Sequence, residues 1–145
     1  MKFNLVIDKS SEPSVTVVCD KVTSTVSKIE QLCKAESDQN ILYGYQGGEI
    51  RPIELWAVTC FFTKNGKVFA RIDGEEYAIK IRIKDVEEMT DDSFVKINQG
   101  CVANVSRIKK FTATLGAGLK VIFDDESTDF VSRREVTNVK RRFGL

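Results

Sequence analysis

The chain has 145 residues and a formal net charge of +1, with 42% hydrophobic and 30% charged residues. This length and balance indicate one globular domain, or one domain with a small appendage, and exclude a disordered chain. No histidine is present, which removes the most common general base and most zinc sites. No apolar run approaches the roughly 20 residues of a membrane span, and no signal-peptide pattern opens the chain, so we expect a soluble, cytoplasmic protein.

The first 40 residues have the pattern of a small β-β-α unit. Residues 2–7 and 15–19 are typical of short strands, and Asp20 is a candidate N-cap for a following helix. The apolar residues of that helix recur at helical spacing: Val22, Val26, Ile29 and Cys33. We therefore predict an N-terminal β-β-α extension over residues 1–40 and a larger domain over residues 41–145.

From residue 41 onward the pattern is mainly β. Asn65-Gly66 predicts a tight hairpin, and the residues on both sides of Asp73-Gly74 alternate between apolar and polar, as half-buried strands do. A short acidic helix is predicted over residues 84–89. The main strands of this domain are predicted at residues 41–45, 67–72, 76–83, 94–97, 108–114 and 119–123.

Near the C-terminus, Ser132 and Glu135 have the S-x-x-E spacing of a capping box, which predicts a helix that begins after Ser132. Arg133 and Arg134 would then occupy the first two helical positions, where the free N–H groups already carry partial positive charge. A cation there costs about 0.3–1 kcal/mol, which an anion bound at this helix end would offset. The alternative is a solvated arginine pair beside a carboxylate, and both interpretations are equally supported. The carboxylates available for such a pair are those of Asp124, Asp125 and Asp129.

Charge is distributed unevenly along the chain. The net charge is −1 over residues 1–40, −3 over residues 41–95 and +5 over residues 96–145. The basic third also places Asn98 and Gln99 at the end of an apolar strand, just before a short turn. One basic face is enough to attract a polyanion, and amide side chains can pair with adenine. The four cysteines form no C-x-x-C motif and are expected on apolar faces; Cys101, beside this strand end, is the one that oxidation could reach.

Five segments resemble, in this order, the LytTR DNA-binding domain, the output domain of many bacterial response regulators. They are residues 61–70, 76–83, 86–89, 94–108 and 130–144, and the last two contain Phe-Val-x-Ile…Val-x-Asn-x-x-x-Ile and Val-Ser-Arg-Arg. The resemblance covers roughly residues 45–145. It implies a mainly β, α+β fold of about ten short strands that lies along DNA, with loops entering successive major grooves. The β-β-α lead-in, without a receiver domain, resembles stand-alone regulators of Gram-positive bacteria, which are often encoded beside a small membrane protein that restrains them.

The resemblance implies DNA-binding residues in three places: Lys64, Asn65, Gly66 and Lys67 in the hairpin, Asn98 and Gln99 in the turn, and Arg134 at the start of the last helix. Arg134 has the donors to read guanine, and Asn98 or Gln99 could read adenine. The residues assigned to phosphate are Lys64, Lys67, Lys96 and Arg133.

This chain departs from the family at two points. Gly66 stands where many members have a polar or histidine side chain, which leaves readout at the hairpin to Asn65 or Lys67. Many members also have a histidine and a different amide or arginine where this chain has Asn98-Gln99, so which of the two contacts a base stays open. Asn104 is expected to be structural.

We therefore predict a sequence-specific regulator of transcription that binds double-stranded DNA, with two protomers on repeated half-sites and no cofactor, metal or small-molecule substrate. The alternative is a protein-interaction module whose basic third docks an acidic or membrane-protein partner without specific DNA binding. Residues 1–40 are the candidate surface for a membrane partner. An enzyme is the weakest hypothesis, because no nucleophile, base and orienting group come together in the sequence.

Overall fold

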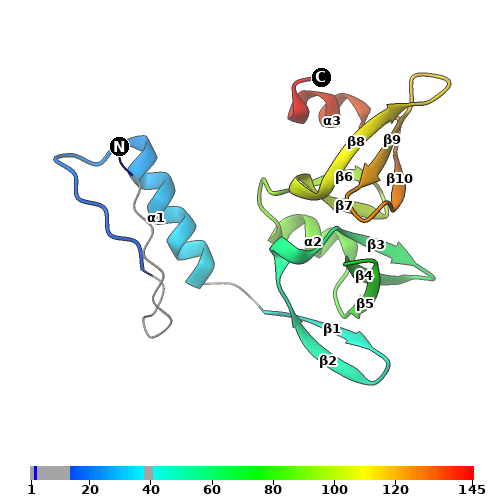
Figure 1. Ribbon diagram of the computed structural model, residues 1–145, viewed down its shortest axis with the longest axis horizontal. Coiled ribbons are helices and arrows are strands. Elements are labelled where there is room, and N and C mark those ends of the chain that lie inside the picture. Colours follow the sequence, from blue (N-terminus) through cyan, green and yellow to red (C-terminus); the bar gives the residue numbers. More distant parts are fainter. Residues whose placement is uncertain (1, 3–13, 38–40) are drawn as a thin grey trace. The chain divides into compact units, whose positions relative to one another are not determined.

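The computed structural model describes residues 2, 14–37 and 41–145 (Figure 1). The chain divides into two compact units, the N-terminal unit (residues 1–40) and the β domain (residues 41–145). Within the described ranges, no helix is long and apolar enough to cross a membrane.

The described part of the N-terminal unit contains one regular element, the helix α1 (Ser24–Ser37). Thr23 caps this helix, because its Oγ1 accepts the Val26 N–H at 3.4 Å and its carbonyl accepts the Ser27 N–H at 3.0 Å. The predicted helix is confirmed, but its cap is Thr23 and not Asp20. Asp20 is too far from the first helical turn for its carboxylate to reach the N–H groups there.

The strand predicted at residues 15–19 is wrong. These residues have no regular secondary structure, and the valines among them are exposed. A strand needs a neighbour for its N–H and C=O groups, and the described residues of this unit offer none. Residues 3–7 of the other predicted strand lie outside the described residues.

The β domain consists of a seven-stranded antiparallel sheet in the order β2-β1-β5-β4-β3-β7-β6 and a three-stranded one in the order β10-β9-β8. The large sheet contains β1 (Leu42–Gln46), β2 (Glu49–Ile53), β3 (Cys60–Lys64), β4 (Lys67–Ile72), β5 (Glu75–Ile79), β6 (Phe94–Asn98) and β7 (Cys101–Asn104). The small sheet contains β8 (Ile108–Ala113), β9 (Leu119–Phe123) and β10 (Thr128–Val131). The helices are α2 (Ile83–Met89) and α3 (Val136–Phe143), with short 3-10 turns η1 (Leu55–Ala57) and η2 (Val105–Arg107). This architecture confirms the predicted mainly β, α+β fold class.

Both predicted hairpin turns are present. Asn65 and Gly66 have φ angles of 52° and 74°, and Asp73 and Gly74 have φ angles of 50° and 81°. Two consecutive residues with positive φ match the twist of the flanking strands, which is why Asn-Gly and Asp-Gly favour this kind of connection. The first turn brings Lys64 and Lys67 opposite each other at the end of β3 and β4.

The large sheet has a different core on each face. On one face, Phe61, Val68 and Val102 pack with Val86 of α2. On the other face, Cys60, Ile97 and Cys101 pack against the small sheet and α3, where Val121, Phe123 and Val139 are fully buried. Figure 1 shows α2 and the small sheet at separate places along the large sheet. This arrangement follows from the strand period, since successive side chains point to opposite faces.

Two predicted boundaries are wrong. The strand expected over residues 76–83 ends at Ile79, because the chain bends at residues 80–81 and Ile83 enters the core as the first residue of α2. The last helix begins at Val136, so Arg133 lies in the turn that precedes it. The expected capping box does not form, because the Ser132 N–H, which Glu135 would have to accept, is donated to the Ile97 carbonyl at 2.8 Å.

Candidate nucleic-acid interface

Three turns that are far apart in the sequence meet on the β domain. Strand β3 pairs with β7, and the Thr63 N–H donates to the Gly100 carbonyl at 2.8 Å, so the hairpin tip lies beside the β6–β7 turn. The Ser132 N–H donates to the Ile97 carbonyl at 2.8 Å, which holds the segment after β10 at the end of β6. We call the residues of these turns, 64–67, 98–100 and 132–134, the three-turn surface.

Asn98 is held by three hydrogen bonds within the protein. Its Nδ2 donates to Asp129 Oδ1 at 3.1 Å and to the Phe130 carbonyl at 2.8 Å, and its Oδ1 accepts the Gly100 N–H at 2.9 Å. The side chain is partly buried. Both amide donors are therefore used inside the protein, together with the amide oxygen.

Gln99, the neighbouring amide, has the opposite character. Its side chain is exposed and makes no hydrogen bond to any residue that the structure describes. Its two donors and its oxygen are available to a ligand. The two amides that the sequence left as alternatives thus differ in what they can offer.

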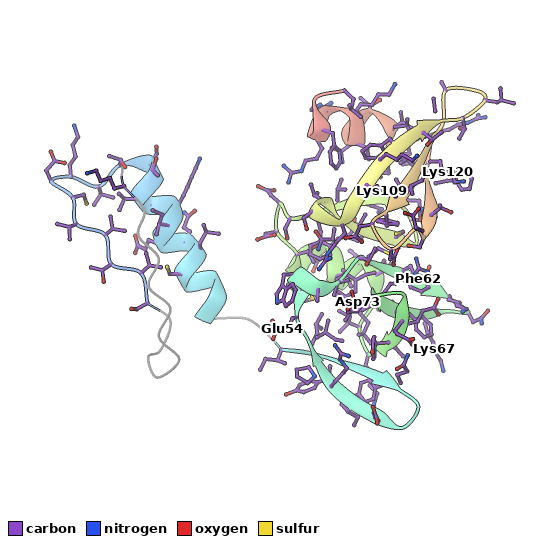
Figure 2. The ribbon with its side chains drawn as sticks, viewed as in Figure 1. Glu54, Phe62, Lys67, Asp73, Lys109 and Lys120 are labelled. Carbon is purple, nitrogen blue, oxygen red and sulfur yellow. The ribbon has the colours of Figure 1, made fainter. Side chains whose placement is uncertain are left out.

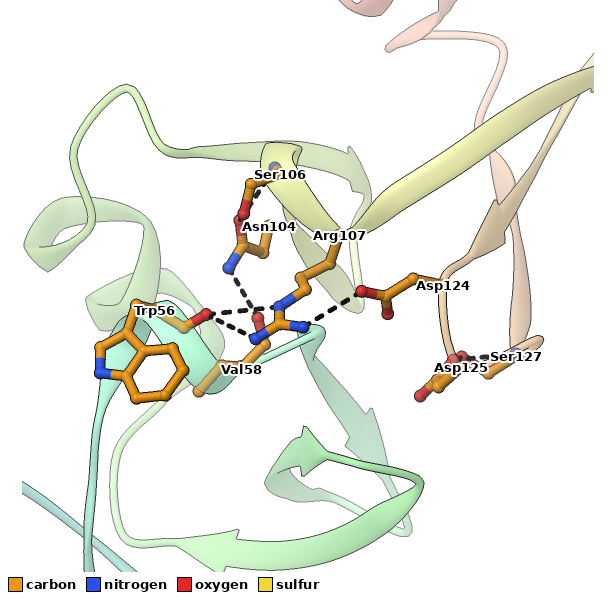
Figure 3. Close-up of polar contacts among 8 residues, drawn as sticks. All are labelled: Trp56, Val58, Asn104, Ser106, Arg107, Asp124, Asp125 and Ser127. Carbon is orange, nitrogen blue, oxygen red and sulfur yellow. Dashed lines mark hydrogen bonds and ion pairs between the residues drawn. The ribbon is translucent and has the colours of Figure 1, made fainter.

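Arg133 and Arg134 are exposed in the turn before α3, and neither forms an ion pair with a described residue. The three aspartates that the sequence offered as partners for this pair have other contacts. Asp124 pairs with Arg107 at 3.1 Å, Asp125 accepts from Ser127 at 2.9 Å, and Asp129 accepts from Asn98. Figure 3 shows the first two of these contacts on the β9–β10 turn. Because it forms no ion pair with a described residue, the arginine pair presents its donors to the surroundings.

The three lysines that the sequence assigned to phosphate differ in whether an acidic side chain pairs with them. Lys67 lies at the start of β4, exposed and without an acidic partner in the described part of the chain (Figure 2). Lys64 is paired with Glu76 at 3.2 Å. Lys96 is paired with Glu87 of α2 at 3.3 Å, on the face of β6 that is turned toward that helix. The structure brings Lys64 and Lys67 to the three-turn surface but does not bring Lys96 there.

Asn65 and Gly66 form the exposed tip of the hairpin. Beside it lies an open concavity of about 710 Å³, lined by Lys67, Lys80 and Tyr45 among others. The Lys80 ammonium lies 4.5 Å from the centre of the Tyr45 ring. Lys80 is a cation next to the hairpin that the sequence alone did not single out, because its nearness depends on the pairing of β4 with β5.

Cys101 lies beneath the β6–β7 turn and is 1% exposed. A hydrogen bond with the Cys60 thiol and burial raise the pKa of the Cys101 thiol well above its ordinary value. A buried thiol that resists ionisation reacts slowly with oxidants, so the expectation that oxidation could reach Cys101 is wrong. Its position is explained by the strand period, which turns the side chain into the core below the small sheet.

The sequence did not show that three residues hold the turns together: Thr63, Gly100 and Asp129. Thr63 binds Gly100, and a Cβ at Gly100 would lie 2.5 Å from Thr63 Oγ1. Asp129 binds Asn98 and also accepts the Phe130 N–H at 2.7 Å. The glycine that directly follows Asn98-Gln99 was the one available signal, since a missing side chain in a strand turn indicates a close approach of another segment. Within the described residues, no group of acidic or cysteine side chains is arranged to hold a metal ion.

Comparisons with known proteins agree with this architecture. The family model of the LytTr DNA-binding domain matches residues 48–144. An uncharacterized HTH-type transcriptional regulator of Staphylococcus aureus (strain MSSA476) is 24% identical over 146 residues, spanning 100% of this chain and 99% of that protein. A regulator of the same description from strain NCTC 8325 is 23% identical over the same span. The fold is similar to that of a solved LytTr DNA-binding domain from Bacillus cereus, with a TM-score of 0.69, 16% identity and coverage of 74% of this chain and 100% of that chain.

Proposed function

Because the chain belongs to the LytTR DNA-binding domain family, we propose that it is a transcriptional regulator that binds specific double-stranded DNA sequences through the three-turn surface. The relatives that match its full length are named transcriptional regulators. The observation that carries the proposal is the state of Arg133 and Arg134, exposed cations that form no ion pair with a described residue. Such a pair attracts an anion, and the phosphates of DNA supply a dense row of them.

The contacts of each side chain suggest its role on DNA. Arg134 has the fork of donors that pairs with O6 and N7 of guanine, and Gln99 has a free donor and acceptor for adenine. Lys67 and Arg133 are suited to phosphate, which positions the protein without reading sequence. Lys64 can join them after exchanging Glu76 for phosphate, since an exposed ion pair of this kind contributes only about 0–1 kcal/mol.

Lys96 and Asn98 are assigned less direct roles in this proposal. Lys96 is bound to Glu87 on the α2 side of the sheet, and Asn98 has no free donor for a base. Asn65 and Gly66 present the hairpin tip to the groove, with the Asn65 amide as the one side chain there that can contact a base edge.

The experiment is fluorescence anisotropy of the full chain with tiled duplexes from the region upstream of its own gene, at two salt concentrations. We expect tight binding to one tile, weakening as salt is raised. Arg134→Ala should lower affinity for that tile by about 1–3 kcal/mol and relax specificity, whereas Lys67→Ala should weaken all duplexes alike and reduce the salt slope by about 1.

Lys28→Ala, which removes one positive charge in α1, outside the matched residues 48–144, is the control for a simple loss of charge. It should leave both the affinity for the preferred tile and the preference for it unchanged. Binding of equal, weak strength to every tile would contradict the proposal, and equal losses on preferred and unrelated DNA for Arg134→Ala would remove its base-reading role.

A further inference from the structure

Asn98 connects the two turns that carry the proposed base-reading residues. Its Nδ2 is bound to Asp129 and to the Phe130 carbonyl, both of β10, while its Oδ1 closes the β6–β7 turn at the Gly100 N–H. An amide that reads adenine needs one free donor and one free acceptor in the same plane. Asn98 has both donors committed at 3.1 and 2.8 Å, so it is not available as a reader in this conformation.

The contacts on either side of Gln99 fix the path of the chain there. Before it, Asn98 is tied to β10, and after it, Gly100 is tied to β3 through the Thr63 N–H at 2.8 Å. Gly100 also leaves no room for a side chain, because a Cβ would lie 2.5 Å from Thr63 Oγ1. With both neighbours turned inward and bound, Gln99 is the residue of this turn whose side chain is exposed.

The same bonds set the turn relative to the segment that carries Arg134. The Phe130 carbonyl accepts from Asn98, and the Ser132 N–H donates to Ile97, so β10 and its continuation are held to the end of β6 at two points. The Asp129 carboxylate is itself oriented, because Oδ1 also accepts the Phe130 N–H at 2.7 Å. The Asn98 side chain therefore bridges the β6–β7 turn and β10, the strand that leads into the turn of Arg134.

We propose that Asn98, oriented by Asp129, is a positioning residue for DNA recognition, which holds Gln99 and Arg134 at a fixed spacing so that both reach base edges in one binding event. This rests on the proposed function above. Backbone segments held in their binding geometry before the ligand arrives lose less conformational freedom on binding, which favours the correct sequence over others.

The test measures the specificity ratio, which is the affinity for the preferred duplex divided by that for an unrelated duplex of equal length, for the full chain. Asn98→Ala, a change without charge, is expected to lower the ratio by about tenfold or more, because Gln99 and Arg134 lose their common support. Asp129→Ala should lower it less, since the Phe130 carbonyl still holds the Asn98 amide.

A double-mutant cycle separates positioning from direct contact. If Asn98 acts through Gln99, the variant carrying Asn98→Ala and Gln99→Ala should have a ratio close to that of Asn98→Ala alone. Additive losses both in this cycle and in the matching cycle of Asn98→Ala with Arg134→Ala would mean that Asn98 acts independently of the two readers and would overturn the proposal. An unchanged ratio with an equal loss on both duplexes would also overturn it, because Asn98 would then serve the fold alone.

Circular dichroism and urea unfolding show whether each variant is folded. If Asn98→Ala does not fold, Asn98→Ser gives the same test, because it keeps an oxygen for the Gly100 N–H and loses the donors to β10. Failure of the proposed function is a different result, since the unaltered chain would then show no preferred duplex at all.

Discussion

Asn104→Ala is expected to destabilise the β domain by about 2–3 kcal/mol, which is a large share of the stability of a domain this size. Asn104 is 2% exposed at the end of β7. Its Nδ2 donates to the Val58 carbonyl at 2.8 Å, and its Oδ1 accepts the Ser106 N–H at 3.0 Å and the Ser106 hydroxyl at 2.8 Å (Figure 3). The side chain thus ties η2 to the segment that leads into β3.

The magnitude follows from what each partner does when the amide is removed. Val58 is fully buried, so its carbonyl loses a partner that water does not replace, at about 1–3 kcal/mol. Ser106 is exposed, so water hydrates its N–H and hydroxyl, and only the loss of the η2 cap remains, at about 0.5–1 kcal/mol. The first contribution dominates.

The assay is urea unfolding of the full chain followed by circular dichroism. With an ordinary dependence on urea, the expected loss moves the midpoint of Asn104→Ala down by about 1–2 M without changing the slope. Ser106→Ala is the matched control, because it removes the hydroxyl that donates to Asn104 Oδ1 and leaves the bond to the Val58 carbonyl intact. Its shift of the urea midpoint should be much smaller. A shift for Asn104→Ala no larger than that of Ser106→Ala would refute the reasoning, since the buried carbonyl would then not be the source of the loss.

Three further predictions concern single contacts. Gly100→Ser should destabilise the domain, because its Cβ would lie 2.5 Å from Thr63 Oγ1. Adding Thr63→Ala should then restore most of the urea midpoint, and no restoration would exclude this contact as the cause. Hydrogen bonds from the side chain and backbone of Ser93 hold the pKa of Asp91 below its ordinary 3.8. Asp91 therefore stabilises the folded chain above pH 3.8, and this contribution disappears as the pH falls through the lower, folded-state pKa. Asp91→Asn should therefore reduce the loss of stability between pH 5 and pH 2, and identical acid profiles would contradict this assignment. Iodoacetamide should modify Cys101 only after unfolding, unlike the two exposed cysteines of the N-terminal unit, and equal rates in the native chain would show that the thiol is accessible.

Local patterns identified most of the β domain. The Asn65-Gly66 and Asp73-Gly74 turns and the alternating residues between and after them predicted β4 and the start of β5, because turn chemistry and side-chain alternation are properties of neighbouring residues. The failed capping box at the last helix involves a partner that is distant in the sequence. The Ser132–Glu135 spacing predicted a capping box, but the Ser132 N–H is bound by Ile97, a residue of another strand.

The candidate site shows the same limit. The sequence identified which turns carry amides and cations, but it could not show which of those groups already have partners. Asn98 and Gln99 are neighbouring amides, and they differ because Asp129 and Phe130, more than thirty residues away, accept from one of them. Only the pairing of strands and the packing of the two sheets determine that difference, and neither is encoded in the local pattern.

The expected anion site at Arg133 and Arg134 rests on a different feature in the structure than in the sequence. In the sequence it rested on the cost of placing cations at the positive end of a helix, but α3 begins at Val136, and both arginines precede it. In the structure, both arginines are exposed and form no ion pair with a described residue, and this feature supports an anion there in place of the helix end. An arginine pair that already formed ion pairs within the protein would gain less from binding the phosphates of DNA. Asp124, Asp125 and Asp129 instead bind Arg107, Ser127 and Asn98, so these contacts stabilise the β9–β10 turn and orient Asn98 while the arginine donors remain available to a ligand.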